Sequence, residues 1–321
     1  MPHRVSRRAV LPLLACPAVA RAQGAWPNGP IRLVVPFAPG SQPDLMGRLV
    51  ADPLGAALGV PVVVENRPGV AGNLGTEAVI RARPDGQTLL FGTVNNAINQ
   101  TFFRPAFDWL RDLGPIAAIY MTPNVVLVNA ALPASSLADL VALAKDQPGR
   151  LNFASSGSGT SLHLAGELLN QIAGIAMVHV PYRAAAAAAQ DLEAGRVQVM
   201  FDNLAPALAR IEGGRVRALA TTAPVRSSRL PDMPTAAEAG FPGLTMLIWG
   251  GLFAPARTPP AVMARLSAEC ADIVASPALA ARLDALGSVA PERDRGAFRA
   301  FTVAETERWG HVVTLSGAKP D

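Results

Sequence analysis

Serine, glycine and threonine residues gather in one segment of the chain, residues 151–167 (LNFASSGSGTSLHLAGE). An apolar, strand-like run ends there in a loop of small residues, and a helical pattern of leucines follows the loop. Small residues let a ligand approach the backbone, and the unpaired N–H groups at a helix start carry partial positive charge. The hydroxyls of Ser156, Ser158 and Thr160 add further donors. This order of strand, small loop and helix predicts an anion-binding site.

Another loop of the same kind lies in residues 34–48 (VVPFAPGSQPDLMGR), again between a strand-like run and a helical pattern. Asp44 falls in the first turn of that helix, where an acidic side chain complements the helix dipole. The same carboxylate could instead fix the loop or accept a hydrogen bond from a ligand, and the sequence leaves these roles open. Two anion-binding loops on a chain with few other reactive groups favour binding over catalysis.

Known catalytic motifs match this sequence poorly. The Gly-Ser-Gly run at residues 157–159 lacks the spacing of a nucleophile elbow, and Leu162 stands where the dinucleotide-binding pattern has its third glycine. His163 could act as a general base for Ser156 or Ser158, or could simply hydrogen-bond the loop from its helix. The histidines beyond the N-terminal segment are not at metal-ligand spacing, so we expect no metal and no cofactor.

Polar residues follow several of the predicted strands. Asp202 could receive an amine or a hydroxyl of a ligand, or it could brace its own loop. Arg183, after Tyr182, could pair with a carboxylate or face solvent, and Asn95 could cap a helix or touch the ligand. His179 is interpreted as structural. Because ligands of open α/β sheets bind beyond the carboxyl ends of the strands, these positions are candidates for a binding site.

Strand-like and helical runs alternate along the chain, which predicts parallel sheet covered by helices on both faces. The alternation pauses at two apolar runs, residues 116–120 and 125–129, which suit a connection between domains, and the run 246–253 could return the chain to the first domain. We therefore expect two α/β lobes, a ligand cleft between them and closure about a hinge. The expected strands are residues 31–35, 62–65, 88–92, 152–154, 177–180, 199–201 and 217–221, and the expected helices include 44–58, 72–82, 136–145, 259–275, 277–286 and 293–315.

The first 22 residues have the pattern of an export signal. A basic start leads into an apolar stretch, and Ala20-Arg21-Ala22 fits the cleavage rule, which predicts a cut after Ala22. Cys16 in this stretch also hints at a lipidated cysteine. Cleavage would leave Cys270 alone, without an intramolecular disulfide, and we interpret it as a small buried hydrophobic residue.

Loss of this segment changes the charge of the chain. It would remove four of the 28 basic residues and none of the 24 acidic residues, so the remaining chain carries no net charge. Composition then gives no support for a nucleic-acid partner. No other run is long and apolar enough to cross a membrane, and we expect a soluble, periplasmic protein.

A set of motifs in fixed order resembles the Bug family, the periplasmic receptors of tripartite tricarboxylate transporters. The resemblance covers essentially the whole chain beyond the export signal. It implies a type II periplasmic-binding-protein fold whose two lobes close on a small carboxylate. The matching segments are IRLVVPFAPG (31–40), VENRPGVAG (64–72), PDGQTLL (84–90), SSGSGTSLHLAGE (155–167), HVPYR (179–183), MFD (200–202), LPDMPTAAEAG (230–240) and WGGLFAP (249–255).

The resemblance also implies a set of binding residues. Backbone amides and hydroxyls of residues 37–41 in lobe one and 155–160 in lobe two would hold the carboxylate, while His163, Tyr182 and Asp202 match positions near the cleft. Ser41, Pro43 and Ala184 depart from the family pattern. The expected ligand-binding residues are Phe37, Ala38, Gly40, Ser41, Asp44, Asn95, Ser155, Ser156, Gly157, Gly159, Thr160, His163, Tyr182 and Asp202.

The domain and function predictions follow from this resemblance. Residues 1–22 are the export signal, 23–124 with 248–321 form lobe one, and 125–247 form lobe two. The chain is expected to be no enzyme but a receptor that passes a small carboxylate to the membrane permease subunits of a tripartite transporter. Two alternatives stay open: an exported serine hydrolase using Ser156 or Ser158 with His163, and a ligand-sensing subunit of a signalling system.

Overall fold

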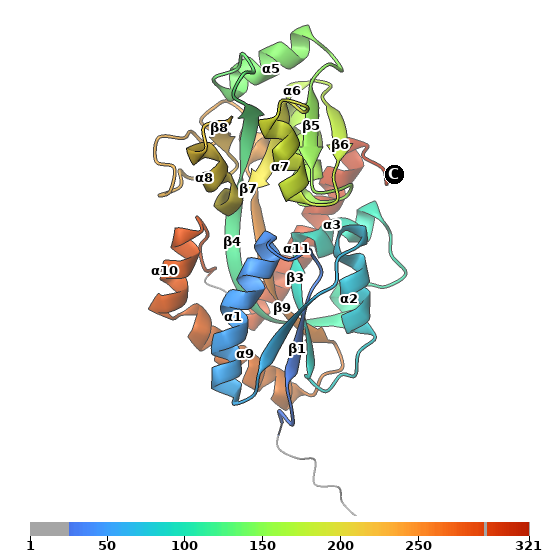
Figure 1. Cartoon of the computed structure of the whole chain (residues 1–321). Helices are drawn as coiled ribbons and strands as arrows, with labels where there is room; N and C mark the ends of the chain where they lie inside the picture. The colour runs from blue at the N-terminus through green and yellow to red at the C-terminus, as the bar shows by residue number, and fades with distance from the viewer. Residues whose placement is uncertain (1–25, 292–293, 321) are drawn as a thin grey trace, which may run out of the picture.

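Two α/β lobes, one above the other in Figure 1, are joined by two long strands. The computed structural model describes residues 26–291 and 294–320, so the export signal, its cleavage point and Cys16 lie outside the described residues. Within those ranges no helix combines the length and the apolar character needed to cross a bilayer.

Lobe one is built on three parallel strands, with β1 between β2 and β3. Strand β1 is apolar along its length (IRLVV) and largely buried, as a strand covered on both faces must be. Its elements are β1 (Ile31–Val35), α1 (Gln42–Leu58), β2 (Val62–Asn66), the 3₁₀ turn η1 (Val70–Gly72), α2 (Asn73–Ile80), β3 (Thr88–Thr93), α3 (Val94–Phe102) and the short α4 (Trp109–Asp112).

Lobe two repeats the pattern of strand and helix. Strand β5 pairs in parallel with β6 and with β7, while β8 runs antiparallel to β4. Its elements are α5 (Leu137–Asp146), β5 (Asn152–Ser155), α6 (Ser161–Ala173), β6 (Val178–Pro181), α7 (Ala185–Glu193), β7 (Val199–Asn203), α8 (Leu204–Glu212), β8 (Val216–Thr221) and the 3₁₀ turn η2 (Pro242–Leu244).

Strand β4 (Leu113–Asn129) links the lobes. The two apolar runs expected around Thr122 and Pro123 are one continuous strand of 17 residues. It pairs with β9 (Leu247–Pro255) as far as Pro123 and with β7 from Asn124 onward, so a single strand belongs to both lobes. The parallel sheet was predicted for the alternating strands only; β4 and β9, the two strands that connect the lobes, run antiparallel to their neighbours.

The C-terminal helices lie on lobe one and behind the junction (Figure 1). They are α9 (Pro260–Val274), α10 (Pro277–Ala285) and α11 (Arg295–Ser316), which confirms the predicted helices within a few residues. Helix α11 is fastened to β9 by buried Glu305, whose Oε2 accepts hydrogen bonds from Nε1 of Trp249 at 2.9 Å and of Trp309 at 3.1 Å. Cys270 is buried in α9 as expected.

Candidate functional site

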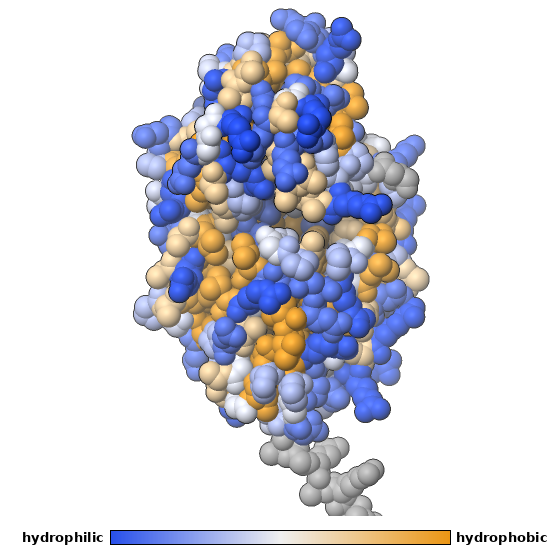
Figure 2. Space-filling model, in the orientation of Figure 1, coloured by the Kyte–Doolittle hydropathy of each residue, from blue (hydrophilic) through white to orange (hydrophobic). Residues whose placement is uncertain are grey.

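A cavity of about 180 Å³ opens between the lobes. Figure 2 shows the surface hollowed at mid-height, where the two lobes meet. Lobe one contributes the loop before α1, the start of α3, and one residue each from β4 and β9. Lobe two contributes the starts of α6, α7 and α8. The residues that line the cavity include Phe37, Ala38, Gly40, Ser41, Gln42, Thr93, Asn95, Tyr120, Ser156, Thr160, Arg183, Ala184, Asp202, Asn203, Arg210 and Ile248.

Five helices begin at this cavity. Their N-cap residues are Ser41 for α1, Thr93 for α3, Thr160 for α6, Ala184 for α7 and Asn203 for α8, and all five line the cavity. The side chains of Ser41, Ala184 and Asn203 do not cap their own helices. Each helix start carries roughly half a positive charge on N–H groups without helical partners. Five such ends around one cavity make it attractive to an anion.

The loop before α1, residues 37–41, is called the first loop here, and Asp44 holds it from beneath. Its Oδ2 accepts from the Gly40 N–H at 2.9 Å, and its Oδ1 accepts from Nδ2 of Asn66 at 2.8 Å. Burial alone would raise the pKa of Asp44, but hydrogen bonds from Arg48, Gly40 and Asn66 outweigh it and hold that pKa below the ordinary value. Asp44 does not line the cavity. Of the roles left open by the sequence, the geometry favours fixing the loop.

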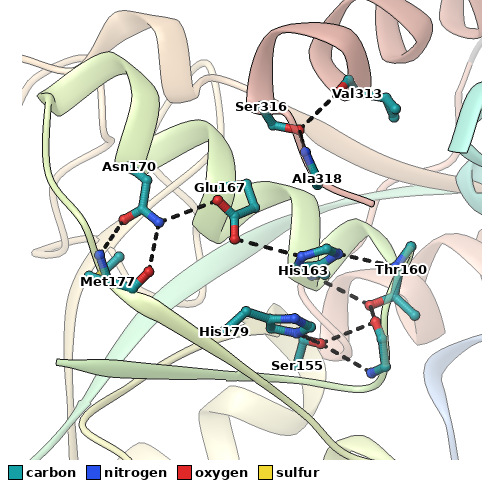
Figure 3. Close-up of polar contacts among 12 residues, drawn as sticks. Ser155, Thr160, His163, Glu167, Asn170, Met177, His179, Val313, Ser316 and Ala318 are labelled. Carbon is teal, nitrogen blue, oxygen red and sulfur yellow. Dashed lines mark hydrogen bonds and ion pairs between the residues drawn. The ribbon is translucent and has the colours of Figure 1, made fainter. Parts of the chain in front are cut away.

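The loop before α6, residues 155–160, is the second loop, and two stacked histidines hold it (Figure 3). The ring centroids of His163 and His179 are 3.8 Å apart. The Gly159 N–H donates to Nδ1 of His163 at 3.1 Å, and the Ser155 hydroxyl lies 2.7 Å from Nε2 of His179. Thr160 donates from Oγ1 to the Gly157 carbonyl at 2.7 Å, which tightens the turn. Ser155, Gly157, Gly159 and His163 therefore shape the loop from behind, and Ser156 and Thr160 face the cavity.

The contacts of the histidines argue against the hydrolase. His163 uses Nδ1 to accept from a backbone N–H, and its Nε2 lies 3.7 Å from Glu167. The Ser155 hydroxyl, which lies at hydrogen-bond distance from Nε2 of His179, is fully buried. A nucleophile must reach its substrate, so this pair positions the loop.

Asp202 lies at the end of β7 and lines the cavity with Arg210 of α8. Its side chain is fully buried, its Oδ1 accepts from the Asn203 N–H at 2.9 Å, and its Oδ2 forms an ion pair with Arg210. Removal from water raises the pKa of Asp202 to about 6, against the opposing effects of Arg210 and the Asn203 N–H.

Of the other candidate residues that follow strands, Asn95 and Arg183 line the cavity and Tyr182 does not. Asn95 lines the cavity, while the cap of α3 is made by its neighbours Thr93 and Asn96. Tyr182 does not line the cavity: its hydroxyl donates to Oδ2 of Asp191 at 2.6 Å, and burial together with Asp191 raises the pKa of Tyr182 to about 12. The contact with Asp191 places Tyr182 outside the lining of the cavity, and its contact with a ligand stays a prediction. Arg183, beside it, lines the cavity and is exposed.

Several lining residues carry no signal that the sequence could reveal. Tyr120 and Ile248 lie within apolar runs, so the sequence predicts that their side chains belong to the hydrophobic core, although both line the cavity. Gln42 is a helix-start residue of ordinary type. Arg210 could have been proposed as a partner of Asp202, because it lies about two turns into the helix that begins directly after the strand of Asp202. Among the described residues no group of histidine, cysteine and acidic side chains could hold a metal ion.

The fold and the cavity define a two-lobe solute receptor of the periplasmic-binding-protein type. The model of the tripartite tricarboxylate transporter family receptor matches residues 46–317. The chain belongs to this family, which confirms the resemblance seen in the sequence and implies a periplasmic location. Its relatives are solute receptors and not enzymes.

Relatives and solved structures agree along most of the chain. A protein encoded in the tcbD–tcbE intergenic region of Pseudomonas sp. strain P51 is 38% identical over 96% of this chain and 94% of its own length. Protein BugT of Bordetella pertussis is 34% identical, over 92% of this chain and 91% of its own.

Two of the similar solved structures are of receptors with a bound carboxylate. Rpa4515 of R. palustris with adipate has a TM-score of 0.87 and 32% identity, and covers 92% of this chain and 100% of its own. MatC of Rhodopseudomonas palustris with bound malate has a TM-score of 0.84 and 31% identity, and covers 90% of this chain and 100% of its own.

Proposed function

We propose that the chain is a periplasmic receptor for a small carboxylate, bound in the cavity between its lobes. The observation that carries this proposal is the meeting of five helix N-termini, two from lobe one and three from lobe two, at one cavity. A carboxylate placed there accepts hydrogen bonds from both lobes, so its binding stabilises the closed arrangement. The adipate and malate bound by the two similar receptors support the same class of ligand.

The direct contacts we propose come from both loops. From lobe one they are Phe37, Ala38, Gly40, Ser41 and Asn95, and from lobe two Ser156, Thr160 and Arg210, which the buried Asp202 holds in place through their ion pair. Asp44, Ser155, Gly157, Gly159 and His163 position these residues without lining the cavity. Ser41 in place of the usual family glycine puts a hydroxyl on the wall, and it donates to the Ala38 carbonyl at 2.6 Å, which keeps the loop compact.

The proposal includes the domain limits and the route. Lobe one would comprise residues 23–124 and 248–321, and lobe two residues 125–247. The change of β4 pairing from Leu247 at Pro123 to Asn203 at Asn124 supports these limits. Export with cleavage after Ala22 and delivery of the solute to the permease subunits of a tripartite transporter complete the role, because the family consists of receptors for such transporters.

A thermal-shift screen tests the proposal. The protein is stripped of bound solute by unfolding and refolding, then heated with a panel of mono-, di- and tricarboxylates. A specific ligand at a hundredfold excess over its Kd should raise the free energy of unfolding by about 2.7 kcal/mol. Carboxylate esters are added in parallel to measure turnover. Release of acid from an ester would favour the hydrolase, and a panel without any stabilising carboxylate would refute the receptor proposal.

A further inference from the structure

The charges around the cavity are unequal, with two cations and one anion among its lining residues. Arg183 and Arg210 are the cations, and Asp202 is the anion. Asp202 and Arg210 form an ion pair with each other. Arg183 is exposed at the cavity and forms no ion pair with any residue in the described ranges. The cavity thus carries one uncompensated side-chain cation in addition to the five helix ends.

The one lining carboxylate is not available to a ligand cation. Asp202 has no exposed surface, and each of its two oxygens already accepts a hydrogen bond, one from Asn203 and one from Arg210. Asp44, the nearest acid of the first loop, is likewise occupied by Gly40, Asn66 and Arg48 outside the lining. An ammonium group buried here would lack a carboxylate partner, which strongly disfavours its binding.

Side chains of lobe one add hydrogen-bond donors. Asn95 and Tyr120 line the cavity and are 5% and 1% exposed, and neither the Nδ2 of Asn95 nor the Tyr120 hydroxyl has a partner among the described residues. A buried polar group without a partner is unfavourable, so both groups favour a ligand atom as their partner. Burial raises the pKa of Tyr120 far above its ordinary value, so the phenol keeps its proton and remains able to donate.

The sheet is shaped to hold Tyr120 in this place. Gly250 of β9 pairs with Tyr120 on one side and with Thr93 on the other. A Cβ at Gly250 would lie 2.4 Å from Cε1 of Tyr120 and 2.9 Å from Cε1 of Phe91, on which the tyrosine ring is stacked. The ring therefore lies across the glycine, and any larger residue at this position would displace it.

From this surplus of positive charge and donors, we infer that the solute is a short dicarboxylate and that amino acids and monocarboxylates are poor ligands. The inference rests on the proposed function and narrows it. One carboxylate lies at the helix ends, and the second pairs with Arg183, which is the specificity-determining residue. Tyr120 and Asn95 donate to the oxygens of the solute from the sheet side.

Calorimetric titration of the stripped protein tests the inference with three matched sets of solutes. We expect succinate, glutarate or adipate to bind at least tenfold more tightly than butyrate or hexanoate, and at least tenfold more tightly than aspartate or glutamate, because each alternative loses one anionic contact or adds an unpaired ammonium. A monocarboxylate or an amino acid that binds as tightly as the best dicarboxylate would overturn the inference and leave the receptor proposal intact. Failure of every carboxylate would instead refute the receptor proposal.

Two pairs of variants separate specificity from folding. Arg183→Gln should weaken dicarboxylate binding about tenfold or more and leave monocarboxylate binding unchanged, whereas Arg150→Gln, which removes the same charge before β5 at the end away from the cavity, should change neither. Tyr120→Phe should weaken binding without loss of thermal stability, because its hydroxyl has no partner in the described structure. Tyr182→Phe should do the reverse, because that hydroxyl bonds Asp191. Equal dicarboxylate affinity in Arg183→Gln and wild type would contradict the assignment.

Discussion

Replacing Arg210 by alanine is expected to lower the free energy of unfolding at neutral pH by about 3–5 kcal/mol, because it strands a fully buried carboxylate without its partner. Asp202 has no exposed surface, and the Arg210 side chain is only 16% exposed. Urea unfolding followed by circular dichroism measures the change. Arg196→Ala is the matched control: Arg196 forms an ion pair with Asp191 at the surface, where its side chain is 64% exposed, and its loss should cost far less, because solvent screens exposed ion pairs.

The same variant should show a characteristic pH dependence. The pKa of Asp202 in the folded protein is about 6, above its ordinary value of 3.8, because of burial. A carboxyl with a raised folded pKa binds more protons in the folded than in the unfolded state, so its contribution to stability is present at low pH and is lost as pH rises through about 6. Removal of Arg210 raises that pKa further.

The loss caused by Arg210→Ala should therefore shrink as pH falls from neutral toward 5, where Asp202 takes up a proton. Arg196→Ala should show no such recovery. A loss of equal size at both pH values would mean that Asp202 is not a buried charge held by Arg210.

Replacing Gly159 by alanine is expected to abolish solute binding and to destabilise the fold by about 2–4 kcal/mol. Gly159 has a φ of +77°, in the left-handed region, and an added Cβ would lie 2.6 Å from Cε2 of Phe103 and 2.7 Å from Cδ1 of Phe102, both on lobe one. The added atom would push the second loop away from α3 and weaken its bond to His163.

Gly174, which ends the same helix α6, gives the control for this prediction. Its φ is +62°, but an added Cβ would meet no atom within 4 Å. Gly174→Ala should therefore show only the cost of a left-handed alanine, about 1 kcal/mol, with solute binding intact. Binding measured by calorimetry and stability measured by urea unfolding give both results. Similar behaviour of the two variants would show that the contact of the second loop with lobe one is unimportant.

Much of the fold could be predicted because the relevant signals are local. Apolar runs such as residues 31–35, closed by a small-residue loop and a helical pattern, specify a strand, a turn and a helix without distant information. The course of β4 could not be predicted in this way. Its two halves look like separate strands, and only pairing with β9 on one side and β7 on the other makes them continuous.

The site likewise has residues that local sequence patterns predict and residues that only tertiary contacts bring to the cavity. Ser41, Ser156 and Thr160 line the cavity and could be proposed from the sequence, because a loop of small and hydroxyl residues before a helix is a local pattern. Tyr120 was missed because an aromatic residue in a buried strand has the same pattern whether it faces the core or a cavity. Tyr182 was expected near the ligand because it matches a family position, but its hydroxyl donates to Asp191, nine residues later. Such partners depend on tertiary contacts that spacing along the chain does not encode.

We propose that the cavity between the lobes binds a carboxylate through the helix N-termini that surround it. The most direct measurement is calorimetric titration of the stripped protein with the best carboxylate from the screen and, separately, with the amide of the same acid. The amide keeps the shape of the acid but removes its charge and one acceptor. We expect binding of the acid at one site per chain and a loss of at least a hundredfold in affinity for the amide, about 2.7 kcal/mol. Equal affinity for acid and amide would show that the helix ends do not recognise the charge of a carboxylate.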